Sequence, residues 1–194
     1  MDLADVAAAI RDGDVAILPT DTVYGVGALP VRARRVFELK RRPIEKALPV
    51  LGSDVARLLG VAELDDVALS LAQKAWPGPL TVVVPRASDF TADLGGTDPS
   101  TVAVRIPDHE LTLELLRLTG PLAVTSANIS GEPPAKTCAA ARDLWPGTVC
   151  LDGGICDGRP STVVSLVGEP RVLREGELPV EQVLEWLRDL RTGS

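Results

Sequence analysis

The chain alternates between short apolar runs and stretches in which apolar residues recur at helical spacing. Short apolar runs bounded by Pro, Gly, Asp or Ser are typical of buried strands, and they fall at residues 15–18, 48–51, 80–84, 101–106, 122–124, 148–151, 162–167 and 171–173. Apolar residues that share one helical face predict helices at residues 2–11, 31–40, 53–59, 65–75, 109–118, 138–144 and 179–190.

The order of these segments indicates the fold class, which is α/β. Helices separate most of the strands, but the strands within residues 80–106 and 148–173 follow one another directly. A mixed, twisted β-sheet flanked by helices therefore fits better than a Rossmann fold. Because we find no repeat, low-complexity tract or linker, we expect one domain over residues 1–194, with a core at about residues 4–190.

Three polar segments between these elements are predicted to be loops. Pro43 ends the helical pattern before it, which leaves residues 40–46 as a loop. Residues 86–100 are rich in Asp, Thr, Gly and Ser and are long enough to cover a site. Residues 125–131 form a small polar loop after the strand at 122–124.

A polar cluster follows the first predicted strand. Pro19 ends that strand, and residues 20–27 then bring together two threonine hydroxyls, a carboxylate, the only tyrosine and two glycines. Ligands of open α/β sheets gather at the carboxyl ends of strands, and glycines let the backbone approach a ligand closely. The alternative is a Thr/Asp turn between two strands, with Tyr24 as an ordinary core aromatic.

Composition narrows the class of ligand. Lys and Arg number 20 against 27 Asp and Glu, which gives a formal net charge of −7 and argues against a broad nucleic-acid-binding surface. Aromatic residues make up only 3% of the chain, so there is little material for stacking on single-stranded RNA. A local basic cleft remains compatible with this balance.

The cysteines and the amino-terminal segment indicate the compartment. Cys138, Cys150 and Cys156 form no C-x-x-C pair, and His109 is the only histidine, so we expect reduced thiols and no zinc site. The chain starts with an acidic amphipathic stretch, and no apolar run approaches the length of about 20 residues that a membrane span needs. We therefore expect a cytoplasmic protein without membrane contact.

Cations at loops and strand ends are candidates for an anion site. Lys40, Arg42 and Lys46 share the loop at 40–46. Arg105 precedes a strand-ending proline, and Arg174 follows the strand at 171–173. Guanidinium groups form paired hydrogen bonds to phosphate or carboxylate, whereas a lysine supplies a compact charge. For each residue taken alone, an ordinary surface charge is the competing interpretation.

Two familiar nucleotide signatures are missing. The Gly-Val-Gly at 25–27 lacks the third glycine of the dinucleotide fingerprint, because position 30 is Pro30. No glycine precedes a Lys-Ser or Lys-Thr pair, as a P-loop requires. If ATP binds, it must bind through another arrangement, for which the cations above are available.

Several segments resemble the signatures of the YrdC-like family, the threonylcarbamoyl-AMP synthases. They are Pro-Thr-Asp-Thr-Val-Tyr-Gly at 19–25, Lys-Arg-Arg-Pro-Ile-Glu-Lys-Ala-Leu at 40–48, Trp-Pro-Gly-Pro-Leu-Thr at 76–81, Thr-Val-Ala-Val-Arg at 101–105, Ser-Ala-Asn at 126–128, Ser-Thr-Val-Val at 161–164 and Arg-Glu-Gly at 174–176. Rigid turn residues explain the segment at 76–81, so we interpret it as structural. The matches run in order through residues 15–176 and imply a YrdC/RibB-like fold with a basic cleft.

The resemblance implies an L-threonylcarbamoyladenylate synthase, a nucleotidyltransferase that converts L-threonine, bicarbonate and ATP into threonylcarbamoyl-AMP and pyrophosphate. The product serves the threonylcarbamoyladenosine modification of tRNA and would pass to the tRNA threonylcarbamoyl transferase complex, with any contact to tRNA itself weak. Mg²⁺ is expected to accompany ATP through phosphates and water, so no protein ligand is assigned, and Asp21 is the carboxylate to test for that role.

The resemblance also implies roles for individual residues. The catalytic candidates are Lys40, Arg42 and Arg105. The candidates for binding ATP are Lys40, Arg42, Lys46, Thr101, Ser126, Ala127, Asn128 and Arg174. The candidates for binding threonine are Thr20, Thr22, Tyr24, Arg105, Thr125 and Ser161.

Two positions depart from the family pattern. Ala47 replaces the proline that usually follows the motif lysine, and a looser loop is expected there. Leu51 stands where many members carry a histidine near threonine, which bears on substrate choice.

Three alternatives stay open at this point. The first is a paralogue of the same fold that uses carbamoyl phosphate, as in hydrogenase maturation factors. The second is a non-catalytic RNA-binding module, against which the net charge and the low aromatic content count. The third is an amino-acid sensor that binds threonine without turning over ATP.

Overall fold

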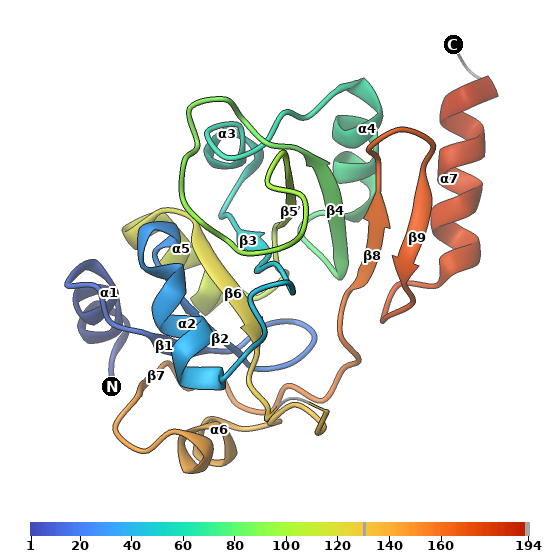
Figure 1. The fold of residues 1–194 in the computed structure, drawn as a ribbon. Coiled ribbons are helices and arrows are strands. Elements are labelled where there is room, and N and C mark those ends of the chain that lie inside the picture. Colours follow the sequence, from blue (N-terminus) through green and yellow to red (C-terminus); the bar gives the residue numbers. More distant parts are fainter. Residues whose placement is uncertain (130, 193–194) are drawn as a thin grey trace.

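A mixed β-sheet forms the centre of the molecule (Figure 1). The computed structural model describes residues 1–129 and 131–192. Within this part of the chain the sheet has nine strands in the order β7-β1-β2-β6-β3-β5-β4-β8-β9. The strands are β1 (Ala16–Leu18), β2 (Gly25–Ala28), β3 (Val50–Leu51), β4 (Leu80–Pro85), β5 (Thr101–Arg105), β6 (Leu122–Ser126), β7 (Val149–Cys150), β8 (Thr162–Ser165) and β9 (Arg171–Arg174).

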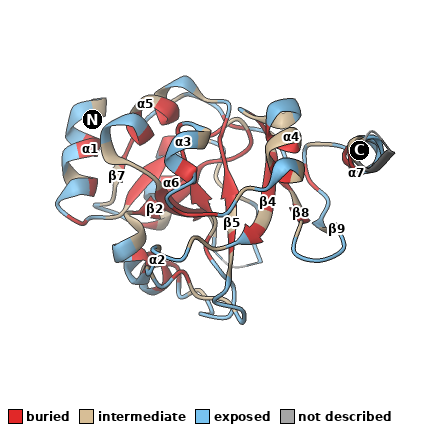
Figure 2. Cartoon of the chain, turned by 90° about the horizontal axis from the view of Figure 1, so that it is seen from above, coloured by how far each residue is buried: buried red, intermediate tan, exposed pale blue. Residues whose placement is uncertain are grey.

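Helices cover the sheet, as the burial pattern in Figure 2 shows, with buried strands in the middle and exposed residues on the outer sides of the helices. The helices are α1 (Leu3–Arg11), the short 3-10 helix η1 (Pro30–Arg32), α2 (Ala33–Lys40), α3 (Val55–Leu58), α4 (Asp66–Ala75), α5 (Glu110–Thr119), α6 (Cys138–Leu144) and α7 (Val180–Thr192). No helix in the described ranges has both the length and the apolar character needed to cross a membrane.

The two faces of the sheet bury different clusters of apolar residues. Along β1, Ile17 points into the larger cluster, whereas Ala16 and Leu18 point into the smaller one, as expected when side chains alternate between faces. Helices α2, α3, α4, α6 and α7 contribute to the larger cluster. Helices α1 and α5 pack together and cover part of the other face. Because both faces of β1 are buried, its sequence is apolar throughout rather than alternating.

The structure confirms the predicted mixed sheet with flanking helices, and most predicted elements differ only by one or two residues at their ends. Residues 25–28 form β2, which pairs with β1, so the polar segment lies between two neighbouring strands. The predicted loop at 125–131 is wrong at its start, because Thr125 and Ser126 belong to β6, where they pair with Val26 and Gly25. Ser130 in that segment lies outside the described residues.

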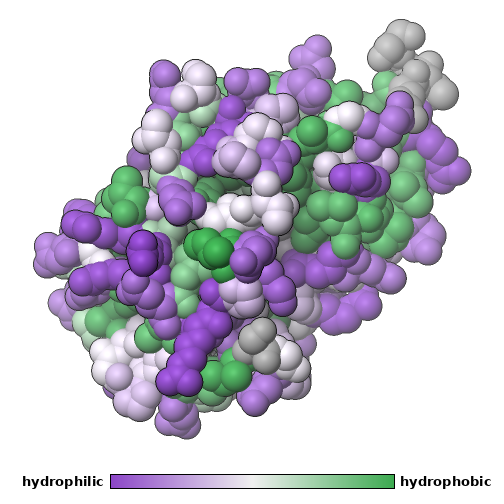
Figure 3. All heavy atoms as spheres, viewed as in Figure 1, coloured by the Kyte–Doolittle hydropathy of each residue, from purple (hydrophilic) through white to green (hydrophobic). Residues whose placement is uncertain are grey.

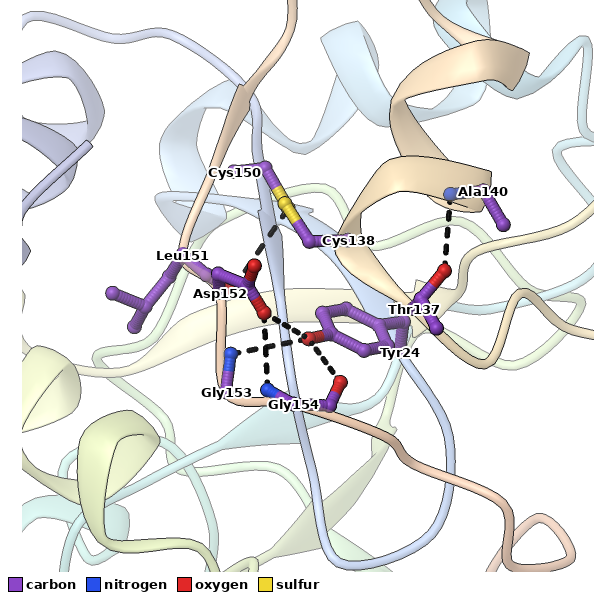
Figure 4. The surroundings of a disulfide bond; sticks show 9 residues. All are labelled: Tyr24, Thr137, Cys138, Ala140, Cys150, Leu151, Asp152, Gly153 and Gly154. Carbon is purple, nitrogen blue, oxygen red and sulfur yellow. Dashed lines mark hydrogen bonds between the residues drawn. A yellow bond between two sulfur atoms is a disulfide. The ribbon is translucent and has the colours of Figure 1, made fainter.

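The expectation of three reduced thiols is wrong for Cys138 and Cys150, which the structure joins in a disulfide (Figure 4). Helix α6 and β7 contact each other and bring the Cα atoms of these residues to 6.2 Å, within the range of disulfides. The separation of 12 residues in sequence gave no sign of this approach. Cys156 is a buried free thiol, and burial raises its pKa, which makes it a poor nucleophile.

Strand β2 approaches β6 so closely that its glycines are required. A Cβ on Gly27 would lie 2.7 Å from the carbonyl oxygen of Ala123 and 2.7 Å from Cγ2 of Val124. A methyl group cannot fit at that distance without a shift of the strand backbone. Gly60, by contrast, would place its Cβ 3.7 Å from the carbonyl oxygen of Arg57, an ordinary contact.

We therefore expect Gly27→Ala to lower the free energy of unfolding by about 1–3 kcal/mol, the usual cost of overpacking. The matched change Gly60→Ala should alter it by less than about 0.5 kcal/mol. Urea unfolding of both variants and the parent chain measures the difference. Equal stability of the two variants would show that β2 and β6 separate readily.

Candidate functional site

A pocket of about 270 Å³ opens on the face of the sheet that α1 and α5 leave partly uncovered. Residues from loops and from several strands line it, and none of the described lining residues is acidic. They are Thr20, Thr22, Val23, Gly25, Arg42, Ala47, Pro49, Leu51, Thr81, Ala103, Arg105, Val124, Thr125, Ser126, Pro160, Ser161, Val163 and Arg174.

The floor of the pocket is one face of the sheet, close to the ends of several strands. Residues paired across adjacent strands point to the same face, and Leu51 pairs with Arg105, as does Thr81 with Val163. Gly25 and Ser126 form another such pair. The sequence predicted the polar groups at strand ends, and Arg105, Ser126 and Arg174 are the last residues of β5, β6 and β9.

Arg105 is a buried charged residue of the pocket. Its Nε donates to the carbonyl oxygen of Gly78 at 2.9 Å, its Nη1 to Oγ1 of Thr22 at 3.2 Å, and its Nη2 to Oδ1 of Asp21 at 2.5 Å. Burial lowers the pKa of Arg105, and the Asp21 carboxylate opposes that shift. The guanidinium therefore stays charged and fixed at the edge of the pocket.

Thr20 holds the loop after β1 in shape. Its hydroxyl donates to the carbonyl oxygen of Val23 at 2.6 Å and accepts from the backbone N–H groups of Thr22 and Val23. Since that proton is used, the 2.9 Å contact between the hydroxyls of Thr20 and Thr22 has Thr22 as the donor. Thr22 can then accept from Arg105, and the loop presents one defined set of acceptors.

Arg42 and Arg174 bring two further guanidinium groups to the pocket. Arg42 donates from Nε to the carbonyl oxygen of Lys46 and from Nη2 to that of Ala47, at 2.9 and 3.1 Å. Arg174 donates from Nε and Nη2 to the carbonyl oxygen of Ser161, at 3.1 and 2.8 Å. Each guanidinium carries five N–H donors, so both keep donors for a ligand.

Lys40 lies beside the pocket at the end of α2. Its ammonium donates to the carbonyl oxygen of Ser126 and, at 3.1 Å, to Oδ1 of Asn128. The amide of Asn128 is fixed by the carbonyl oxygens of Ile129 and Glu132, at 3.0 and 2.8 Å. These contacts use two of the three N–H groups of Lys40 and leave one for a ligand.

Four cationic side chains lie close enough to lower one another's pKa values; they are Lys40, Arg42, Arg105 and Arg174. Burial, and secondarily the charge of Arg42, lower the pKa of Lys40 to about 8. Burial likewise lowers the pKa of Arg42, with a contribution from Arg174, and the pKa of Arg174, with a contribution from Arg105. A cluster of cations without a lining carboxylate is suited to an anion of several charges, such as a polyphosphate.

The residues singled out from the sequence either line the pocket, lie beside it, or lie away from it. Thr20, Thr22, Thr125, Ser126 and Ser161 line the pocket with the arginines, whereas Lys40 and Asn128 adjoin it. The structure does not bring the remaining candidates to the lining; these are Tyr24, Lys46, Thr101 and Ala127.

Three of these outlying residues have structural contacts instead. The hydroxyl of Tyr24 donates to the carbonyl oxygen of Gly154 at 2.9 Å and accepts from the N–H of Gly153 at 3.1 Å, so the ring holds the turn after β7 (Figure 4). The hydroxyl of Thr101 donates to the carbonyl oxygen of Asp98. Lys46 contributes its carbonyl oxygen to Arg42 and leaves its side chain exposed.

Sequence reasoning missed several residues that form the pocket. Thr81 lies in the segment interpreted as structural, yet its hydroxyl is 2.8 Å from that of Ser161 and lines the pocket. Pro49, Ala103 and Val163 form walls. Only alternation along the strands could have indicated them, and that required the pairing of strands distant in sequence.

Asp21 does not fit a metal-ligand role. Its Oδ1 accepts from Arg105, its Oδ2 is buried, and the residue is absent from the lining. Across the described residues we find no group of three or more His, Cys, Asp or Glu side chains that could hold a metal ion. A metal that accompanies a polyphosphate would have to be held by the phosphates and water.

A protein-family model matches most of this chain. The Sua5/YciO/YrdC model, described as "Telomere recombination", matches residues 8–176. This range contains the pocket and all residues named above as its lining.

Comparison with individual proteins gives relatives of two lengths. The threonylcarbamoyl-AMP synthase of Pyrococcus abyssi is 40% identical over 192 residues, covering 94% of this chain and 56% of that relative. A putative threonylcarbamoyl-AMP synthase of Mycobacterium tuberculosis is 40% identical over 187 residues, covering 92% of this chain and 86% of the relative. The chain therefore spans little more than half of the archaeal relative.

Solved structures agree in fold. P. abyssi Sua5 complexed with L-threonine has a TM-score of 0.88 and 35% identity, over 96% of this chain and 58% of that one. E. coli YciO has a TM-score of 0.85 over 92% of this chain and 91% of that one, at 23% identity, which supports the fold alone. Figure 3 shows the face of this chain that is seen in Figure 1; hydrophilic residues are spread over it, and apolar residues gather over β8 and β9.

Because the pKa of Lys40 is about 8, we expect the affinity for an anion to fall with rising pH. Between about pH 7 and about pH 9 the ammonium changes from mostly protonated to mostly neutral, so the Kd for tripolyphosphate should rise about tenfold. Lys40→Arg keeps its charge over this range and should show a smaller rise. Calorimetric titration of both proteins measures these Kd values, and the difference between the proteins excludes the protonation of tripolyphosphate itself as the cause. The same dependence of Kd on pH in both proteins would contradict the role of Lys40.

Proposed function

The chain belongs to the Sua5/YciO/YrdC family, and from this we propose that it is an L-threonylcarbamoyladenylate synthase. The reaction would join L-threonine, bicarbonate and ATP to give threonylcarbamoyl-AMP and pyrophosphate. The observation that carries the proposal is one pocket in which a cluster of cations adjoins a small site with a fixed guanidinium, hydroxyls and apolar walls. The cations suit the triphosphate, and the small site suits an amino acid.

The amino-acid end of the pocket would bind threonine by its carboxylate and its methyl group. Arg105 keeps one N–H on each terminal nitrogen beyond its three protein contacts, and these donors would meet the carboxylate. Leu51 and Val124 provide an apolar wall for the methyl group. The position of Leu51 supports selection of a side chain with a methyl group rather than a purely polar one.

The nucleotide end would bind ATP through Lys40, Arg42 and Arg174. In the first step the threonine amine attacks bicarbonate, and loss of water leaves a carbamate. An oxygen of the carbamate then attacks the α-phosphorus of ATP, a new P–O bond forms, and the bond to pyrophosphate breaks. The cations would stabilise the charge that develops on the phosphates, and no covalent protein nucleophile takes part. Mg²⁺ bound to the phosphates would add to that stabilisation.

Hydrogen bonds hold the loop that carries Arg42. The carbonyl oxygen of Ala47 accepts from Arg42. The loop is also joined to the segment at 86–100, because the N–H of Leu48 donates to Leu94 and that of Gly96 to Ile44. This arrangement supports a nucleotide site that is formed before the ligand binds.

The proposal predicts pyrophosphate release from ATP that requires both L-threonine and bicarbonate. Purified protein would be assayed with ATP and bicarbonate, adding L-threonine, L-serine or carbamoyl phosphate in separate reactions. Release with carbamoyl phosphate alone would indicate a paralogue with another carbamoyl donor. Threonine binding without release would indicate a sensor, and salt-dependent RNA binding without release would indicate an RNA-binding module.

The phosphate role of Arg174 predicts a selective kinetic defect. Arg174→Gln should raise the KM for ATP about tenfold, the effect of one lost charge-assisted hydrogen bond, and leave the KM for L-threonine within about twofold. Arg34→Gln, on an exposed part of α2, is the matched control and should leave both constants unchanged. Steady-state pyrophosphate release measures all three proteins. A larger change in the KM for threonine would remove Arg174 from the phosphate site.

A further inference from the structure

We propose that Asp21 is a positioning residue: it holds the guanidinium of Arg105 in the one orientation that leaves both terminal nitrogens able to bind the carboxylate of the amino-acid substrate. This inference rests on the proposed function and adds a residue that determines how the substrate is held. The argument depends on how the donors of Arg105 are shared among its partners.

Three partners on three segments determine the orientation of Arg105. The carbonyl oxygen of Gly78, in the turn before β4, accepts a hydrogen bond from Nε. Oγ1 of Thr22 accepts from one N–H of Nη1, and Oδ1 of Asp21 accepts from one N–H of Nη2. A guanidinium has five N–H groups in a plane, so this arrangement leaves one on each terminal nitrogen. Since Arg105 lines the pocket, these two donors are the ones available to a carboxylate there.

The ion pair between Asp21 and Arg105 is made through one oxygen only. Oδ1 accepts from Nη2, whereas Oδ2 is buried and has no hydrogen-bond partner among the described residues. A paired contact through both oxygens would be the stronger arrangement in isolation, but it would occupy a second N–H of the guanidinium. The single contact leaves that donor to the ligand, at the cost of one unsatisfied buried oxygen.

The location of Asp21 explains why it cannot act as a substrate contact itself. The side chains of Asp21 and Arg105 are only 13% and 6% exposed, and Asp21 is absent from the pocket lining. Its charge therefore acts on the ligand through Arg105 alone. Without the Asp21 carboxylate, the guanidinium would be held by two neutral acceptors, which resist rotation and displacement less strongly.

The test compares L-threonine with L-threoninol, an analogue that lacks the carboxylate. For the isosteric variant Asp21→Asn, we expect the Kd for L-threonine to rise about ten- to a hundredfold, while the Kd for ATP changes less than about threefold. The Kd for L-threoninol should be the same in the variant and the parent chain, because no carboxylate meets Arg105. Asp143→Asn, an exposed change on α6, should alter none of these constants.

A second comparison separates positioning from a general effect on folding. Arg105→Lys removes the guanidinium that Asp21 holds, so Asp21→Asn added to it should weaken threonine binding little further. Binding is measured by calorimetry well below the thermal midpoint of each variant. Equal weakening of threonine, threoninol and ATP binding, or full additivity of the two changes, would overturn the role of Asp21. If the parent chain itself binds no threonine, it is the proposed function that fails.

Discussion

The compensation of one buried charge, that of Arg105, sets the arrangement of the pocket. A guanidinium removed from water must find acceptors and a countercharge, and two of its partners, Asp21 and Thr22, come from the loop after β1. In the sheet, β2, β6 and β3 lie between β1 and β5, so this loop must extend over the open face to reach Arg105. The polar end of the pocket forms where the loop and β5 meet. Fold and site are therefore fixed by the same contacts.

The uncovered part of the sheet turns a core surface into a binding surface. Leu51 and Val124 belong to the apolar cluster under α1 and α5, and both also line the pocket. The core thus continues into the pocket without a boundary. Gly25 and Ala103 lie on the floor of the pocket, and a Cβ on Gly25 would lie 2.6 Å from Cγ1 of Val124. Small residues at these positions leave space that larger side chains would fill.

The sequence predicted the helices and strands better than it predicted contacts between residues that are distant in sequence. Apolar spacing located the strands and helices, because burial on both faces of the sheet leaves a strong local pattern. The motifs located Thr20, Thr22, Arg42, Arg105 and Arg174, which the structure brings to one pocket. It could not show that Thr81 faces Ser161, that Cys138 meets Cys150, or that Tyr24 holds the turn at 152–154. These contacts depend on strand order and register, which have no local signature.

The charge distribution links the stability of the chain to its ligand. The protein carries a formal net charge of −7, yet its pocket gathers Arg42, Arg105 and Arg174 beside Lys40, with no carboxylate among the described residues that line it. Burial, and secondarily the charge of Arg42, lower the pKa of Lys40, so its charged form is disfavoured in the folded chain. A polyphosphate bound in the pocket would offset the cost of charging Lys40, and it would thereby stabilise the folded chain. The formal net charge of −7 would at the same time oppose broad binding of nucleic acids.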